Sequence, residues 1–194
     1  MSGKRLVVLI SGSGSNLQAI LDACAADELR AQVAAVISDQ ADAFGLERAR
    51  RAHVPAILKP KLKTQDRRTY DVELADQVAA YQPDWVVLAG WMRILTSAFL
   101  DRFPHRVINL HPALPGAFPG THAIERAHEA YRRGEINHTG VMVHLVPDEG
   151  VDCGPVLAQA VVPIQSDDTL DLLEARIHSV EHGLLVETLK KLAN

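Results

Sequence analysis

The sequence predicts an α/β protein: an open, mostly parallel and twisted sheet, with helices on both faces and an antiparallel addition near the C-terminus. Near-continuous aliphatic runs such as 5–10 and 84–89 are typical of parallel strands that are buried on both faces. Helical patterns separate these runs, which favours right-handed crossovers between parallel strands. The stretches 139–146 and 156–164 alternate apolar and polar residues across a turn, so we expect an antiparallel pair there.

The composition describes a chain that can bury a core and has no excess of positive charge. With 194 residues, 47% of them hydrophobic, one domain is expected. A net charge of −4 argues against nucleic acid as the main partner, because phosphate contacts require a basic surface. No apolar run reaches the about 20 residues that span a bilayer. The two cysteines, Cys24 and Cys153, lack metal or redox spacing. We therefore expect a cytoplasmic protein with reduced thiols and small-molecule partners, which is either a monomer or a homodimer.

The first strand, 5–10, runs into the loop Ser11-Gly12-Ser13-Gly14-Ser15-Asn16, and a helical pattern follows. A Gly/Ser turn of this kind exposes backbone N–H groups at the positive end of a helix dipole, which predicts a phosphate site. A dinucleotide cofactor is the alternative. Two glycines begin the required pattern and Asp39 stands where a ribose-binding acid would lie, but Leu17 occupies the third glycine position.

The next elements are predicted from their apolar spacing. Helices are expected at 43–52 and 70–80, and Pro55 predicts an edge strand because proline lacks an N–H donor. The basic stretch 59–68 is either a solvated loop or a site for an acidic tail of a ligand. The residues from Gly90 to Leu95 are either core or an apolar slot for a flat ring. Thr96 is expected to cap a short helix over 97–102.

A strand over 106–111 ends at a Pro/Gly-rich loop. Because alternate residues of a strand share a face, Asn109 and His111 point the same way at its carboxyl end. Ligands of open α/β sheets bind at that end. The sequence therefore predicts a functional site around an amide and an imidazole.

The last third contains two ambiguous patterns. After a polar helix over 121–133, the turn 147–155 carries three carboxylates, which fit either an ordinary acidic turn or a site. The final helix, 169–192, is expected to begin at a cap formed by Ser166 or Asp167. Its His178-x-x-Glu181-His182 matches an inverted zinc motif, but no third ligand is marked, so a metal is not expected.

Three segments together resemble the folate-dependent formyltransferases: Asn109-Leu110-His111-Pro112-Ala113-Leu114, Phe118-Pro119-Gly120, and the turn 148–155. The segments 10–20 and 41–49 are similar to the members that formylate glycinamide ribonucleotide in purine biosynthesis. The resemblance runs from about residue 5 into the last helix. It implies a Rossmann-like formyltransferase domain over 1–194, with a phosphate-binding half (about 1–100) and a folate and catalytic half (about 101–194). It also implies 10-formyltetrahydrofolate as formyl donor and no metal.

The resemblance further implies a role for individual residues. The catalytic set would be Asn109, His111 and Asp152. The ribonucleotide would contact Gly14, Ser15, Asn16 and Glu181. The folate would contact Arg67, Met92, Arg93, Ile94, Leu95, Asn109, Asp148, Glu149, Gly150, Val151 and Asp152. The sequence departs from many relatives at Leu114-Pro115-Gly116 and at Cys153, and at none of the three catalytic positions.

The expected chemistry explains these residue types. A side-chain amide that donates to an oxyanion contributes about 3 to 4 kcal/mol, a role that suits Asn109. His111 would supply a second hydrogen bond and a proton, and the charge of Asp152 would raise the pKa of His111. The alternatives are another formyltransferase or hydrolase of the same superfamily, each expected to need an additional domain, or a nucleotide-cofactor-binding protein. A binding module without catalysis would give the three side chains no reason to converge.

Overall fold

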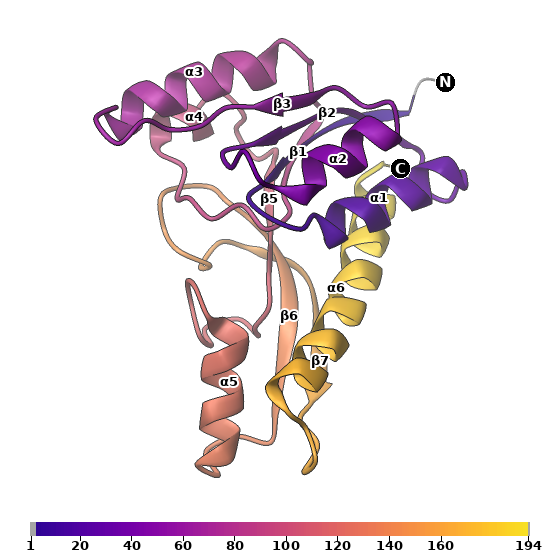
Figure 1. The fold of residues 1–194 in the computed structure, drawn as a ribbon, viewed down its shortest axis with the longest axis vertical. Helices are drawn as coiled ribbons and strands as arrows, with labels where there is room; N and C mark the ends of the chain where they lie inside the picture. The colour runs from indigo at the N-terminus through magenta and orange to yellow at the C-terminus, as the bar shows by residue number, and fades with distance from the viewer. Residues whose placement is uncertain (1–2, 194) are drawn as a thin grey trace.

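The computed structural model describes residues 3–193, whose strands form a seven-stranded sheet in the order β3-β2-β1-β4-β5-β6-β7 (Figure 1). The elements in chain order are β1 (Lys4–Ile10), α1 (Ser15–Ala25), β2 (Ala31–Ser38), α2 (Phe44–Arg51), β3 (Ala56–Leu58), α3 (Arg67–Ala79), β4 (Trp85–Leu88), α4 (Ser97–Leu100), β5 (Val107–His111), α5 (Ala123–Arg132), β6 (His138–Leu145), β7 (Val156–Pro163) and α6 (Leu170–Ala193).

The sheet has the predicted mixture of strand directions. The pairs among β1 to β5 are parallel, whereas β6 runs antiparallel to β5 and β7 antiparallel to β6. The short β3, which follows Pro55, lies at one edge, as a missing N–H donor requires. The predicted fold class is therefore confirmed, and the carboxyl ends of β1, β2, β4 and β5 meet along one edge of the sheet.

Both faces of the sheet are covered, which explains the continuous aliphatic runs. Along β1, Leu6, Val8 and Ile10 pack in a cluster with residues of α1 and α6, while Val7 and Leu9 pack with residues of α3 and α4. All five side chains are at most 1% exposed. In Figure 1, α1 and α6 lie together on one side of the sheet and α3 on the other, and α6 continues alongside β6 and β7. None of the helices within residues 3–193 has the length and hydropathy that a membrane span requires.

Of the two predicted helix caps, the first stands at the predicted position and the second is wrong. Thr96 is the N-cap residue of α4, but its side chain makes no capping bond. Its backbone N–H instead donates to the buried carboxylate of Asp71, at 2.6 Å. At α6 the N–H of Leu172 donates to Thr169 Oγ1, so neither Ser166 nor Asp167 is the cap. In the first case a tertiary contact holds the backbone of the N-cap residue, and in the second the helix begins at a different hydroxyl.

The approach of the acidic turn to β6 depends on Gly154. A Cβ at this position would stand 1.8 Å from the carbonyl oxygen of Leu145. We predict that Gly154→Ala lowers the free energy of unfolding by about 2 kcal/mol, because the backbone must shift to admit the methyl group. The measurement is a urea denaturation curve.

Gly183 is the matched control, since it lies within α6 and a Cβ at this position would have nothing within 4 Å. Gly183→Ala should raise the free energy of unfolding by about 0.5 to 1 kcal/mol, as alanine is the better helix former. Equal effects of the two substitutions would contradict the close approach at Gly154.

Candidate active site

A cavity of about 690 Å³ opens at the carboxyl ends of β4 and β5, closed on one side by the acidic turn. Its walls come from the segments after β4 and β5, the start of α5 and the residues 148–152. The predicted site residues that line it are Met92, Arg93, Ile94, Leu95, Asn109, His111, Asp148, Gly150, Val151 and Asp152. The sequence predicts that the segment after β4 is either core or an apolar slot, and each interpretation holds for some of its residues. Trp91 and Leu95 are buried, whereas Met92 and Ile94 are 67% and 48% exposed.

Two of the predicted catalytic side chains, Asn109 and His111, each contact the third, Asp152. Asn109 Nδ2 donates to Asp152 Oδ1 at 3.0 Å, and His111 Nδ1 lies 3.3 Å from Asp152 Oδ2. The N–H of Gly120 donates to the same Oδ2 at 2.8 Å. Asn109 and His111 share a face of β5, and Asp152 reaches them from the turn, where its backbone has a φ of 51°. A carboxylate thus joins residues that lie about 40 positions from it along the chain.

His144 is a fourth member of this cluster that the sequence interpretation missed. It stands opposite Asn109 in the β5–β6 pair and is 2% exposed. Its Nδ1 lies 2.8 Å from the carbonyl oxygen of Leu145, an acceptor, so Nδ1 carries the proton and Nε2 accepts from Asn109 Nδ2 at 3.1 Å. Both hydrogens of the Asn109 amide are therefore engaged. The alternating pattern of β6 signals a histidine on one face, but only the register places it beside Asn109.

The pKa of His111 is lowered from its ordinary value. Burial disfavours the charged imidazole and is the largest effect, while the charge of Asp152 and the carbonyl of Phe118, 3.1 Å from Nε2, raise the pKa in part. The charge of Asp152 raises the pKa of His111, as expected. The net shift is still downward, because burial outweighs that charge. Each ring nitrogen nevertheless faces an acceptor, so the ring can take up a second proton without reorganisation.

The pKa of Asp152 is also lowered. Burial alone would raise the pKa, but it is lowered by His144, whose Nε2 lies 3.5 Å from Oδ1, by the hydrogen bond from the Gly120 N–H and by the positive charge that His111 can carry. Asp152 is consequently an anion at neutral pH, beside an imidazole that is neutral.

The predicted ribonucleotide residues form a second group. Gly14 is the N-cap of α1 with a φ of 71°, and the first turn of α1 carries no acidic side chain, so its N-terminal dipole is not neutralised there. Asn16 Nδ2 donates to Glu181 Oε2 at 3.1 Å, which joins α1 to α6. Glu181 also faces His178 Nδ1, at 2.8 Å. These residues are not part of the cavity wall.

Two of the zinc-motif side chains, His178 and Glu181, are thus bonded to each other. Within residues 3–193 no group of three or more potential metal ligands occurs. The interpretation of this helix as a metal site has no support in the arrangement of its side chains.

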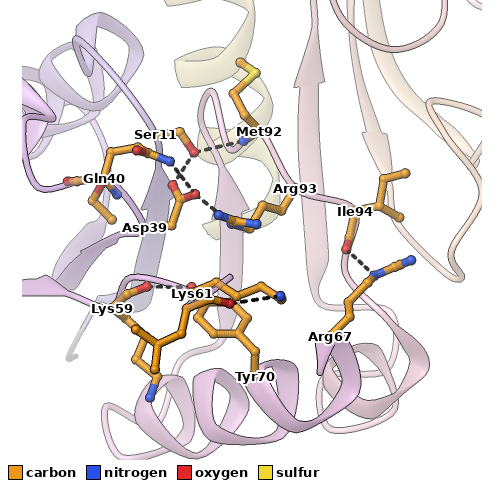
Figure 2. A network of polar contacts seen from close by, with 12 residues as sticks. Ser11, Asp39, Gln40, Lys59, Lys61, Arg67, Tyr70, Met92, Arg93 and Ile94 are labelled. Atoms are coloured by element: carbon orange, nitrogen blue, oxygen red, sulfur yellow. Dashed lines mark hydrogen bonds and ion pairs between the residues drawn. The ribbon is translucent and has the colours of Figure 1, made fainter. Parts of the chain in front are cut away.

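Two of the predicted folate residues, Arg67 and Glu149, lie at the rim of the cavity and not in its wall. Arg67 donates to Glu149 Oε2 at 3.1 Å and to the carbonyl oxygen of Ile94 at 3.2 Å, the second contact being drawn in Figure 2. Arg93, in the wall, donates from Nε to Asp39 Oδ2 at 2.7 Å. Asp39, the acid of the dinucleotide alternative, is therefore buried in an ion pair and not available to a ribose.

Comparisons with known proteins agree with this geometry. The family model described as "Formyl transferase" matches residues 4–189. A phosphoribosylglycinamide formyltransferase from Schizosaccharomyces pombe is 47% identical over 202 residues, covering 96% of each chain. One from Escherichia coli K12 is 46% identical over 179 residues, covering 92% of this chain and 82% of the relative. The structure of glycinamide ribonucleotide transformylase 1 from Symbiobacterium toebii superposes with a TM-score of 0.92 at 44% identity, covering 99% of this chain and 88% of that one.

The chain belongs to the formyl transferase family. Within that family, the relatives named above carry the name phosphoribosylglycinamide formyltransferase or glycinamide ribonucleotide transformylase.

The balance of burial and charge at His111 gives a prediction that needs no substrate. We predict that His111 titrates below the ordinary histidine pKa and that Asp152→Asn lowers its pKa further, because the substitution removes the charge that favours the imidazolium. Histidine-selective NMR titration of both proteins measures the two values. A pKa that rises in the variant would show that Asp152 does not act on His111 through its charge.

Proposed function

We propose that the protein transfers the formyl group of 10-formyltetrahydrofolate to the amine of glycinamide ribonucleotide, giving formylglycinamide ribonucleotide and tetrahydrofolate in purine biosynthesis. The observation that carries this proposal is the contact of Asn109, His111 and Asp152 at the carboxyl end of β5, within a chain of the formyl transferase family. The substrates are small molecules, which agrees with the net charge of −4, and we infer a cytoplasmic location from the same reaction.

The proposed reaction needs one proton to move from the amine to the folate nitrogen. The amine attacks the formyl carbon, its carbonyl oxygen becomes an oxyanion, and the amine nitrogen becomes positively charged. His111 is neutral at rest and can accept a proton from that nitrogen. The imidazolium then donates the proton to the folate nitrogen as the carbon–nitrogen bond breaks. For both transfers Nδ1 stays beside Asp152, and Nε2 must exchange its contact with the carbonyl oxygen of Phe118 for one with the substrate. No covalent enzyme intermediate is required.

Asn109 is the proposed hydrogen-bond donor to the oxyanion. Its amide hydrogens point to Asp152 and to His144 in this structure. One of these bonds must therefore be exchanged for a bond to the formyl oxygen. The bond to Asp152 is the one to exchange, because the imidazolium that forms on His111 supplies Asp152 with a stronger partner.

The two substrates would occupy different parts of the edge. The cavity of about 690 Å³ suits the folate, since ligand pockets span about 300 to 1,000 Å³ and combine apolar walls with a few polar groups. The N-terminus of α1, at Gly14, Ser15 and Asn16, suits the phosphate of the ribonucleotide. Glu181, fixed by Asn16, is the proposed contact to the rest of that substrate.

The direct test is incubation of the purified protein with glycinamide ribonucleotide and 10-formyltetrahydrofolate, with loss of the formyl group followed by absorbance. Turnover that depends on the ribonucleotide is the expected result. Loss of the formyl group without any acceptor would indicate a hydrolase instead. Turnover only with an aminoacylated tRNA would indicate a different transferase.

The proposed mechanism predicts a separation of turnover from binding. Asp152→Asn should lower kcat at least about hundredfold, because it weakens the proton transfer through His111, while the Kd of the ribonucleotide stays within about twofold. Steady-state kinetics and calorimetric titration measure these quantities. A variant with unchanged kcat would remove Asp152 from the mechanism.

A further inference from the structure

Asp39 follows β2 and is one of the most deeply buried charged groups in the part of the chain that the structure describes, its side chain 1% exposed. Both of its carboxylate oxygens accept hydrogen bonds (Figure 2). Ser11 Oγ donates to Oδ1 at 2.7 Å, while Arg93 Nε and Gln40 Nε2 donate to Oδ2 at 2.7 and 2.8 Å. Both oxygens of Asp39 are thus engaged by other residues of this chain.

The ion pair fixes the head group of Arg93. A buried carboxylate is costly unless it is paired, so Asp39 requires the guanidinium. On another side the guanidinium carbon of Arg93 lies 5.8 Å from the ring centroid of Tyr70, and Tyr70 itself donates to the carbonyl oxygen of Lys59 at 2.6 Å. Arg93 is therefore held between a carboxylate and an aromatic ring, both supplied by other elements.

A second contact leads from Asp39 to the same segment through Ser11. The hydroxyl of Ser11 that donates to Asp39 also accepts from the backbone N–H of Met92 at 2.9 Å. The N–H of Ser11 donates to the carbonyl oxygen of Gly90 at 2.9 Å. Asp39 thus orients the Ser11 hydroxyl, because the hydroxyl hydrogen points to the carboxylate and leaves a lone pair for Met92.

The three segments in this network follow β2, β1 and β4, which are neighbours in the sheet. The strand order reverses between β1 and β4, the place where ligands bind in open α/β sheets. Met92 is 67% exposed in the cavity, so few apolar contacts hold its side chain. Its backbone must therefore be held by polar contacts such as the hydrogen bond from its N–H to Ser11.

We propose that Asp39 is a positioning residue: through Arg93 and Ser11 it holds the segment Met92–Leu95 in the conformation that receives the folate. The consequence for folate binding rests on the proposed function; the positioning of the segment does not. Asp39 is not part of the cavity wall, and Asp39→Asn keeps the shape of the side chain while it removes the charge that pairs with Arg93.

The experiment compares Asp39→Asn with Asp168→Asn. Asp168 is the matched control: its side chain is also 1% exposed and pairs with an arginine, Arg176, at 2.6 Å, at the start of α6 and outside the cavity wall. Hydrogen exchange of the peptide 90–95 and the KM values of both substrates are measured in each protein. The Asp39 variant should exchange in this peptide about tenfold faster and show a KM for 10-formyltetrahydrofolate about tenfold higher, with kcat and the ribonucleotide KM within about twofold.

Neither change should appear in Asp168→Asn. Unchanged exchange in the peptide 90–95, or an equal rise of the folate KM in both variants, would overturn the proposal. If Asp39→Asn does not fold, Ser11→Ala keeps the ion pair and removes the two hydrogen bonds of the hydroxyl, to Asp39 and from Met92. It should give the same two changes at about threefold; no change there would also overturn the proposal. A wild-type protein without formyl transfer refutes the proposed function, while the exchange measurement still decides whether Asp39 positions the segment.

Discussion

The carboxylate of Asp152, whose side chain is only 10% exposed, is the constraint on which the site depends. Removing a charge from water is costly unless hydrogen bonds and opposite charges replace the water. The chain supplies Asn109 from β5, the N–H of Gly120 from the following loop, and His144 and His111 as basic neighbours. These groups come from β5, β6 and the loop after β5, so the need to satisfy one anion fixes the positions of the others.

The sheet explains how these groups meet. Parallel strands place the ends of β1, β2, β4 and β5 on one edge, which is where the loop 11–16, Asp39 and Asn109 lie. The antiparallel β6 then returns beside β5 and places His144 opposite Asn109. Burial at this junction also lowers the pKa of His111, so the same packing that assembles the site leaves its imidazole neutral and able to accept a proton.

The sequence predicts the parts of this arrangement that depend on local pattern. Aliphatic runs identified the buried strands, and the side-chain period of two placed Asn109 and His111 on one face. The sequence could not predict the features that depend on strand pairing or on burial. Three features arise from contacts between distant segments: the register that brings His144 beside Asn109, the hydrogen bond from the Thr96 N–H to Asp71, and the lowered pKa of His111, where burial outweighs the charge of Asp152. The same holds for Asp39, which resembles a ribose-binding acid in sequence and is an internal ion pair in the fold.

The central claim is that a neutral His111, beside the anion of Asp152, accepts the proton of the attacking amine. The pH dependence of kcat/KM, measured below neutrality, tests it most directly. Because the neutral ring is the active form and its pKa is lowered, activity should persist to a pH below the ordinary histidine pKa and then fall as the ring becomes protonated. Activity that instead increases as the pH falls through that range would contradict the account, since it would require the imidazolium in the resting enzyme.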